Sequence, residues 1–493
     1  MHTLSFSGPR GDAAGPRPVP GDFDFFLSSY MLGAPDGSNL GVAGYSHEFV
    51  ARLFRPLLER WGSVTDIRHP RAELDAAVAA SRHRGGRPVH FSVLPLQDVY
   101  FAADAVNVVM PAWEFPDVPN QPFDDNPQND WPTTARLADM LLVSGPFTAD
   151  AFRRAGTTTP LAIVPVPTPA GYFRLPPWRP GQVTRLDHWA FVFPGRDERA
   201  DDVVASAVTP DRRRLGRRLE RSLSAAAREL LGADRYERLS RRLKKPRRRT
   251  AEGRADFRSL PYPQVDGLEL SGVVYTSVFN PADGRKNWVD MLNAFLVALA
   301  DRPDATLVLK LIAKSPAVVR QVIDYYLHRQ LPHRCTVAFV CDFLSEEEML
   351  RLCAGSTYYL QSTRAEGNCL PLMNYLAAGR PGISPDHSSL GDYFRPGLGF
   401  VVASHPEPSA WPHDRRLRLR TSWGRIVWPS LHDQIAASYR VAVARPVEYA
   451  AMARDCRTAM EAWAGEPAVA RRLDSALGEL LGGAVAASRR AAA

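Results

Sequence analysis

The chain has 493 residues, of which 45% are hydrophobic and 23% charged, and its formal net charge at pH 7 is +8. This length exceeds what one hydrophobic core serves, so we expect about two globular domains. No stretch approaches the roughly 20 apolar residues of a membrane-spanning helix, and the first 20 residues lack the apolar core of a signal peptide. These features predict a cytoplasmic protein without a transmembrane helix.

The first half of the chain predicts a Rossmann-like domain at 21–200, preceded by a flexible Gly-, Pro- and Arg-rich lead-in at 1–20. A first strand is expected at 23–30, followed by a glycine-bearing loop and an amphipathic helix at 45–61. Further strands are expected at 64–67, 89–93, 105–110, 140–144 and 161–166. Short apolar runs separated by helical or loop stretches are typical of a parallel sheet with crossover helices.

The positive charge is concentrated in one segment, 211–258, which holds 18 Lys and Arg against 7 Asp and Glu. With this segment at +11 and the whole chain at +8, the rest carries a net charge of −3. Leucines at near-helical spacing predict a basic amphipathic helix from Arg213 to Lys245, within an insertion at 201–262. It could lie on the anionic inner face of the cell membrane or bind an acidic polymer. The alternatives are a solvated helix packed on the protein and a disordered basic loop. Because the basic character is local and no nucleic-acid-binding motif is visible, we expect no nucleic-acid partner.

The second half predicts another Rossmann-like domain at 263–430. Strands are expected at 273–278, 306–312, 337–341, 358–361 and 382–384, and helices at 288–300, 317–329 and 370–378. Ser345 precedes three glutamates, which is typical of a helix N-cap. The remainder, 431–493, is expected to be helical with a break at Pro446 and to pack back across the cleft between the domains.

No metal or other cofactor is implied by the sequence. The five cysteines have no Cys-x-x-Cys spacing, which is typical of reduced thiols in the cytosol: Cys335, Cys341, Cys353, Cys369 and Cys456. Asp124 and Asp125 lie in a loop rich in Pro and Asn rather than at the end of a strand, which favours a turn over a metal site.

Two adjacent cations, Arg285 and Lys286, lie in the loop between the strand at 273–278 and the next helix. Parallel α/β sheets bind ligands at the carboxyl ends of their strands. An arginine can bridge a diphosphate through two hydrogen bonds, and a lysine adds a mobile point charge. The pair therefore indicates a diphosphate site, the alternative being an ordinary solvated pair in a loop.

A second loop, 362–371, contains Glu366 and Gly367 after the strand at 358–361. A carboxylate in such a loop can accept hydrogen bonds from sugar hydroxyls, and the missing Cβ of glycine lets the following backbone N–H groups approach a ligand. Pro371 is placed near the first helical turn, where its missing N–H is harmless. The alternative is an ordinary turn between strand and helix.

The segment 273–393 resembles the retaining glycosyltransferases of family four, also known as the glycosyl transferases group one domain. The adjacent Arg285 and Lys286 match the cationic pair of that family, and 362–371 resembles its Ser-x-x-x-Glu-Gly-x-x-Leu-Pro signature. The stretch 375–381, Tyr-Leu-Ala-Ala-Gly-Arg-Pro, resembles the Ala-x-Gly-x-Pro motif that follows.

This resemblance implies an α/β protein of the GT-B type, with two Rossmann-like domains that face each other across a cleft. It implies catalytic roles for Arg285, Lys286 and Glu366. The further donor-binding residues that it implies are Asn280, Gly367, Asn368, Cys369, Leu370 and Asn374. Asn374 departs from the family, because the second glutamate of the Glu-x7-Glu pattern is expected there, and a neutral amide binds ribose hydroxyls more weakly than a carboxylate.

The first half resembles the family less closely. Its glycine-bearing loop, with Gly41 as a donor-binding candidate, resembles the family's glycine-rich entry. Pro111-Ala112-Trp113-Glu114 resembles a Trp-Glu variant beside the reaction centre, so Glu114 is the candidate that orients the acceptor. His90, His47 and His387 are alternative candidates, although a histidine within a strand, such as His90, is more often a packed core residue.

We therefore expect a retaining glycosyltransferase that moves a sugar from a nucleotide-sugar to a hydroxyl of a glycan, a lipid-linked or a small-molecule acceptor. The two cations are expected to stabilise the leaving diphosphate, and the acceptor proton can pass to it, so no strong general base is required. The expected enzyme is metal-independent, because no Asp-x-Asp motif follows a strand. Two alternatives remain open at this stage: a sugar-nucleotide epimerase or phosphorylase on the same scaffold, and a catalytically silent subunit that binds glycans or nucleotides.

Overall fold

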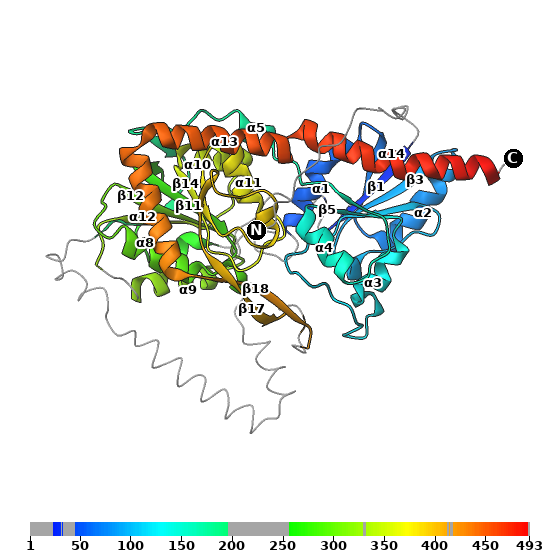
Figure 1. Cartoon of the computed structure of the whole chain (residues 1–493), viewed down its shortest axis with the longest axis horizontal. Coiled ribbons are helices and arrows are strands. Elements are labelled where there is room, and N and C mark those ends of the chain that lie inside the picture. Colours follow the sequence, from blue (N-terminus) through cyan, green and yellow to red (C-terminus); the bar gives the residue numbers. More distant parts are fainter. Residues whose placement is uncertain are drawn as a thin grey trace, which may run out of the picture.

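The computed structural model of the chain describes residues 23–30, 32, 45–195, 256–328, 332–411, 414 and 418–491. The expected lead-in at 1–20, the candidate Gly41 and the basic helix from Arg213 to Lys245 lie outside these residues. The described residues form two α/β units, which lie side by side in Figure 1.

The first unit is built on a sheet of six parallel strands in the order β2-β1-β3-β4-β5-β6. In chain order the strands are β1 (Phe23–Ser29), β2 (Gly62–Ile67), β3 (Arg87–Val93), β4 (Val106–Val109), β5 (Met140–Val143) and β6 (Leu161–Ile163). The main connecting helices are α1 (Tyr45–Leu58), α2 (Pro70–His83) and α4 (Pro146–Arg154). The strand positions expected from the apolar runs are confirmed, because runs such as Phe25 to Leu27 are buried in the sheet.

The second unit has an eight-stranded sheet in the order β16-β15-β14-β11-β12-β13-β8-β9, parallel except for β8 and β9 at one edge. Its strands are β8 (Ala190–Phe193), β9 (Gln264–Val265), β11 (Val273–Phe279), β12 (Ala305–Leu311), β13 (Thr336–Val340), β14 (Tyr358–Leu360), β15 (Gly382–Ser384) and β16 (Gly399–Val401). Its main helices are α8 (Trp288–Ala298), α9 (Pro316–His328), α10 (Glu346–Gly355), α11 (Leu370–Ala377) and α12 (Trp428–Ala444). The expected alternation of parallel strands and helices is confirmed.

The N-cap expected at Ser345 is also confirmed, and it forms a complete capping box at the start of α10. The Ser345 hydroxyl accepts a hydrogen bond from the Glu348 backbone N–H at 3.2 Å, and the Glu348 carboxylate accepts one from the Ser345 N–H at 2.7 Å. Both bonds satisfy N–H groups that a helix leaves without partners at its first turn.

The chain enters the second unit earlier than the boundary at residue 200 suggests. Strand β8 pairs antiparallel with β13, with Phe191 opposite Phe339, and the Phe193 ring packs against the ring of Tyr326. An isolated apolar strand such as β8 can complete either of two sheets, and its sequence pattern is the same in both cases. Only the packing of its phenylalanines in the core of the second unit shows that β8 belongs to the second sheet.

Two C-terminal helices, α13 (Pro446–Ala464) and α14 (Glu466–Ala491), run along one side of the molecule over both units (Figure 1). Helix α13 packs on the second unit, where the Tyr449 hydroxyl donates to the Thr357 carbonyl at 2.8 Å. Helix α14 packs on the first unit, where Leu473 joins its core and Trp61 Nε1 donates to Asp474 at 2.9 Å. The last helices therefore connect the two units.

A two-stranded hairpin, β17 (Ser404–Ala410) and β18 (Arg420–Ile426), is an element that the sequence did not predict. Its β17 strand contains Pro406 and Pro408, and proline within a run of residues argues against a strand because it cannot donate to the ladder. In the structure the hairpin extends from the second unit towards the first (Figure 1). The flanking residue Trp411 packs there against Trp113 and Phe123.

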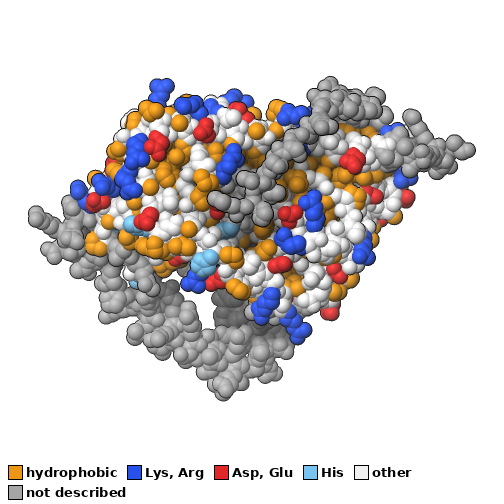
Figure 2. All heavy atoms as spheres, in the orientation of Figure 1, with side chains coloured by type: hydrophobic (Ala, Val, Ile, Leu, Met, Phe, Trp, Pro, Cys, Tyr) orange, Lys and Arg blue, Asp and Glu red, His pale blue; other side chains and the backbone are white. Residues whose placement is uncertain are grey.

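The surface drawn in Figure 2 mixes Lys and Arg with Asp and Glu among hydrophobic and neutral side chains. This distribution agrees with the small net charge outside the basic segment. Within the described ranges, no helix combines the length and the hydropathy that crossing a bilayer requires.

Candidate functional site

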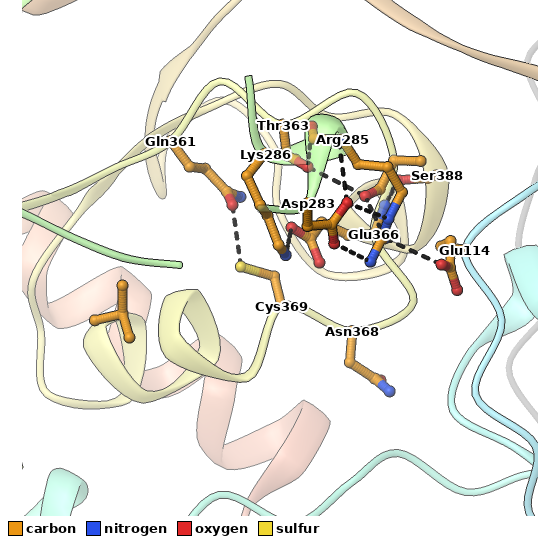
Figure 3. Close-up of polar contacts among 12 residues, drawn as sticks. Glu114, Asp283, Arg285, Lys286, Gln361, Thr363, Glu366, Asn368, Cys369 and Ser388 are labelled. Carbon is orange, nitrogen blue, oxygen red and sulfur yellow. Dashed lines mark hydrogen bonds and ion pairs between the residues drawn. The ribbon is translucent and has the colours of Figure 1, made fainter. Parts of the chain in front are cut away.

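Arg285 is held in place at the carboxyl end of β11 by carboxylates from both units. It lies in a 3-10 turn, Gly284–Lys286, whose N-cap Asp283 accepts a hydrogen bond from the Arg285 N–H at 3.1 Å. The same carboxylate binds the guanidinium through two hydrogen bonds, of 2.7 and 3.2 Å. Glu114, from the loop after β4 in the first unit, lies 3.3 Å from Arg285 Nη1 (Figure 3). The guanidinium therefore marks the place where the two units meet.

Lys286 forms an ion pair with Glu366 at 2.5 Å, and the two side chains are only 20% and 6% exposed. Burial lowers the pKa of Lys286, but Glu366 together with weaker contributions such as that of Asp283 outweighs burial, and the net pKa lies above its usual value. For Arg285, too, burial opposes the charged form and is outweighed by Glu114 and Asp283, so its pKa is raised. Both side chains are therefore cations at neutral pH.

The loop that carries Glu366 is tied to the cation loop by backbone and hydroxyl contacts. The Arg364 N–H donates to the Arg285 carbonyl at 2.7 Å, and Arg285 Nη1 donates to the Ala365 carbonyl at 3.0 Å. The Ser388 hydroxyl accepts a hydrogen bond from the Glu366 N–H at 3.0 Å. These bonds hold the cations and the carboxylate in one arrangement before any ligand binds.

Gly367 lies where the first unit approaches the loop most closely. A Cβ atom at this position would be 3.1 Å from the Trp113 carbonyl oxygen, closer than most side chains tolerate. The Ser144 hydroxyl also donates to the Gly367 carbonyl, at 3.2 Å. The glycine thus allows the close contact between the two units at this loop.

The remaining candidates of this loop sit at the start of α11. Cys369 has a positive φ of 52° at the N-cap, and its thiol donates to the Gln361 side chain at 3.0 Å. The Asn368 carbonyl accepts from the Tyr393 hydroxyl at 2.7 Å, and its side chain is half-buried, as is Leu370. Figure 3 shows Asn368 and Cys369 on the stretch that continues from Glu366. Their backbone therefore borders the ion pairs.

Asn374 and Asn280 have local partners in this structure. Asn374 lies on α11, 8% exposed, with its amide beside the Tyr172 hydroxyl. Asn280 accepts a hydrogen bond from the Ala282 N–H at 3.0 Å through its side chain and thereby shapes the turn before Asp283. Asn280 supports the cation loop, whereas Asn374 is directed towards the segment that links the two units.

The structure places His90 inside the first sheet rather than among the ion pairs. It is fully buried in β3, and its Nε2 is 2.7 Å from the Ser28 hydroxyl. Burial lowers the pKa of His90 to about 4. Its position is that of a packed core residue, the interpretation that its place in a strand favoured.

Acidification is expected to destabilise the protein through His90. An unfolded histidine has a pKa of about 6.5, so stability from the neutral ring is full above pH 6.5 and is lost as the pH falls towards 4. Between pH 7 and pH 5 this group alone contributes a loss of about 2 kcal/mol. Urea unfolding at the two pH values should show a smaller difference for His90→Gln than for the wild type. His405→Gln, at an exposed position, serves as the control. An equal loss of stability between pH 7 and pH 5 in all three proteins would contradict the role given to His90.

The other two histidines lie nearer to surfaces of their units. The His47 ring packs edge-on against Tyr30 at 5.2 Å. His387 lies one residue before Ser388 and therefore near the Glu366 loop, but its Nδ1 contacts the Ser404 hydroxyl at 2.8 Å at the base of the hairpin. Burial lowers the pKa of His387. Of the histidines, His387 is the one that borders the ion-pair cluster.

Sequence reasoning missed Asp283 and Asp392. Asp283 could have been found, because an Asp two residues before Arg285 is typical of an Asx turn. Asp392 could not have been found in this way. Its carboxylate accepts a hydrogen bond from the Phe147 N–H at 3.1 Å, at the first turn of α4 in the other unit, and the two residues are 245 positions apart in sequence. Burial raises the pKa of Asp392 to about 7.

Metal ligands do not gather in the part of the chain that the structure describes: no group of three His, Cys, Asp or Glu side chains could hold an ion there. Asp124 and Asp125 both adopt left-handed backbone conformations, with φ of 51° and 53°, as expected of a tight turn. The five cysteines are buried and unpaired. None of these residues approaches the arrangement of a metal centre.

No protein-family model matches the chain, and no curated protein matches it in sequence. Solved structures do match it in fold. Sucrose-phosphate synthase from Thermosynechococcus elongatus has a TM-score of 0.51 at 14% identity, over 93% of this chain and 99% of that one. HepE from Anabaena in complex with UDP-glucose has a TM-score of 0.47 at 12% identity, over 92% and 99% of the two chains. The expected fold, two Rossmann-like units of the GT-B type, is confirmed by the first of these similarities and by the two sheets.

Proposed function

We propose that the protein is a retaining glycosyltransferase that moves a sugar from a nucleotide-sugar to an acceptor hydroxyl. The observation that carries this proposal is the cluster of Arg285, Lys286 and Glu366 at the carboxyl ends of β11 and β14, with Glu114 of the other unit 3.3 Å from Arg285. In a parallel sheet this is the edge where phosphorylated ligands bind. The GT-B fold, found also in sucrose-phosphate synthase, supports the proposal as an analogy of fold.

In this proposal the two cations stabilise the diphosphate as it leaves the sugar. They are already desolvated and oriented by Asp283, Glu114 and Glu366, so little reorganisation is needed when negative charge develops. Charge-assisted hydrogen bonds from a guanidinium and an ammonium to phosphate oxygens are strong. Electrostatic stabilisation is thus the main catalytic contribution.

Glu366 is proposed to accept hydrogen bonds from the donor sugar, and Glu114 from the acceptor. Glu366 is only 5% exposed within the cluster. Glu114 belongs to the first unit, the unit proposed to bind the acceptor, and contacts Arg285 from there. The acceptor oxygen attacks the anomeric carbon on the face that the diphosphate leaves, and its proton passes to a phosphate oxygen. No metal ion or other cofactor is needed to complete this sequence.

The binding of the ribose, the nature of the acceptor and the binding to a membrane are proposed from the sequence. We propose that the Asn374 amide replaces the ribose-binding glutamate, which requires its side chain to leave the neighbourhood of the Tyr172 hydroxyl when the donor binds. We also propose that the acceptor is a glycan or a lipid-linked sugar, and that the basic segment 213–245, which lies outside the described residues, binds the inner face of the membrane.

A thermal-shift screen against UDP-, GDP- and ADP-sugars tests the proposed function directly. A donor present at 100 times its dissociation constant is expected to add about 2.7 kcal/mol of stability, which raises the melting temperature by several degrees. Release of the nucleoside diphosphate in the presence of an acceptor then establishes transfer. Binding without turnover would indicate the silent-subunit alternative, and the lack of any shift across the panel would refute a nucleotide-sugar site.

A further inference from the structure

A cavity of about 240 Å³ lies between the first unit and the hairpin. One wall is formed by the segment 113–121, which follows β4, and the other by residues that flank and begin β18. Its polar lining includes Asp117, Asn120, Gln121, Arg418, Arg420 and Thr421. The cavity exists only because the unpredicted hairpin reaches the other unit.

Specific contacts hold the two walls together. The Thr421 hydroxyl donates to the Asp117 carboxylate across the cavity at 3.3 Å. Within the first wall, the Trp113 indole N–H donates to the Asp117 carbonyl at 3.1 Å. The rings of Trp113 and Trp411 pack with centroids 5.4 Å apart. These apolar and polar contacts make the cavity a built feature of the interface.

The two chain segments that form the walls of the cavity are connected to the ion-pair cluster through backbone contacts. Trp113 precedes Glu114, and its carbonyl oxygen is the atom that a Cβ at Gly367 would approach to 3.1 Å. On the hairpin side, the Gly424 N–H donates to the Arg364 carbonyl at 2.7 Å, two residues before Glu366. The segment and the hairpin that form the cavity therefore also contact the loop that carries Glu366.

Two arginines give the cavity a charge preference. Arg418 and Arg420 are exposed, and their guanidinium groups form no hydrogen bond or ion pair with any residue that the structure describes. By contrast Arg425, on the same strand β18, is paired with Glu407 at 2.9 Å. Asp117 also lines the cavity and accepts a hydrogen bond from the neutral Thr421 hydroxyl, so the described lining carries two guanidinium groups against one carboxylate.

We propose that this cavity is an acceptor subsite for an anionic glycan, in which Arg418 and Arg420 bind a carboxylate or phosphate on a sugar. The exposed amides of Asn120 and Gln121 supply hydrogen bonds for neighbouring hydroxyls. This inference rests on the proposed transferase function, and it specifies an acidic acceptor for it. The cavity is small enough to take about one sugar unit.

Binding of three defined oligosaccharides tests the subsite. Isothermal titration would use a hyaluronan tetrasaccharide as the carboxylate probe, N-acetylglucosamine 6-phosphate as the phosphate probe and chitotetraose as the neutral probe. The wild type is expected to bind at least one acidic probe more tightly than the neutral one, and more weakly at 300 mM than at 50 mM salt. The acidic probe that binds identifies the anion. Equal affinity for all three would overturn the proposal.

The double variant Arg418→Gln/Arg420→Gln is expected to weaken binding of the acidic probe by about 10- to 100-fold and to leave chitotetraose unaffected. Arg425→Gln is the matched control on the same strand and should bind as the wild type. Wild-type affinity in the double variant would also overturn the proposal. Donor binding is measured in parallel: donors that still bind when acidic probes do not would refute the subsite alone, whereas no donor binding by the wild type would refute the proposed function.

Discussion

Replacing Lys286 with methionine is expected to lower kcat for sugar transfer by about 10²- to 10³-fold, the effect of losing one preorganised group that stabilises developing charge. The Lys286 ammonium is the partner of Glu366 at 2.5 Å and lies beside Arg285, so its loss removes one of the two cations proposed for the leaving diphosphate. The change in kcat is measured as the steady-state release of the nucleoside diphosphate, with the donor that the ligand screen identifies. Lys314→Met, at an exposed position in the same unit, should retain wild-type turnover.

The single variant leaves the buried Glu366 carboxylate without its cation, which could destabilise the loop instead of affecting chemistry alone. The double variant Lys286→Met/Glu366→Gln removes both charges and keeps both shapes. It should melt close to the wild type and still turn over at least 10²-fold more slowly. A folded double variant with wild-type kcat would show that the cluster is not the reaction centre.

Replacing Arg380 with methionine is expected to reduce the free energy of unfolding by about 3 kcal/mol or more. Arg380 is fully buried, and its guanidinium donates only to backbone carbonyls: Cys353, Ala354, Ala378 and Pro176, at 2.9 to 3.3 Å. Three of these carbonyls lie at the carboxyl ends of α10 and α11, where carbonyl groups carry partial negative charge. Methionine would remove these four hydrogen bonds and leave the Ala354 and Pro176 carbonyls without the guanidinium that they bind.

Urea unfolding monitored by tryptophan fluorescence measures this loss. Arg395→Met, at an exposed position of the same unit, is the matched control and should change stability by less than about 0.5 kcal/mol. One of the four hydrogen bonds, to the Pro176 carbonyl, also reaches the segment that links the two units. Equal urea midpoints for Arg380→Met and the control would contradict the structural role given to Arg380.

The regular elements were predictable because their signals are local. A mainly apolar run such as β11 is typical of a strand buried on both faces, and Ser345 with Glu348 satisfies helix N–H groups within four residues. The signal of the cation loop is local as well, because Arg285 and Lys286 are adjacent in sequence. The hairpin was missed because prolines obscure its alternation, and β8 because its sheet is decided by packing.

The sequence by itself determined the two α/β units and the residue types at the strand ends where a diphosphate could bind. Only the tertiary structure decided which of them meet. It brought Glu114 to Arg285, placed Gly367 against Trp113, and put His90, an alternative catalytic candidate, in the core. The physical reason is that hydrogen bonding and periodicity act over a few residues, whereas these contacts join segments up to about 250 residues apart and depend on how the two units and the hairpin pack.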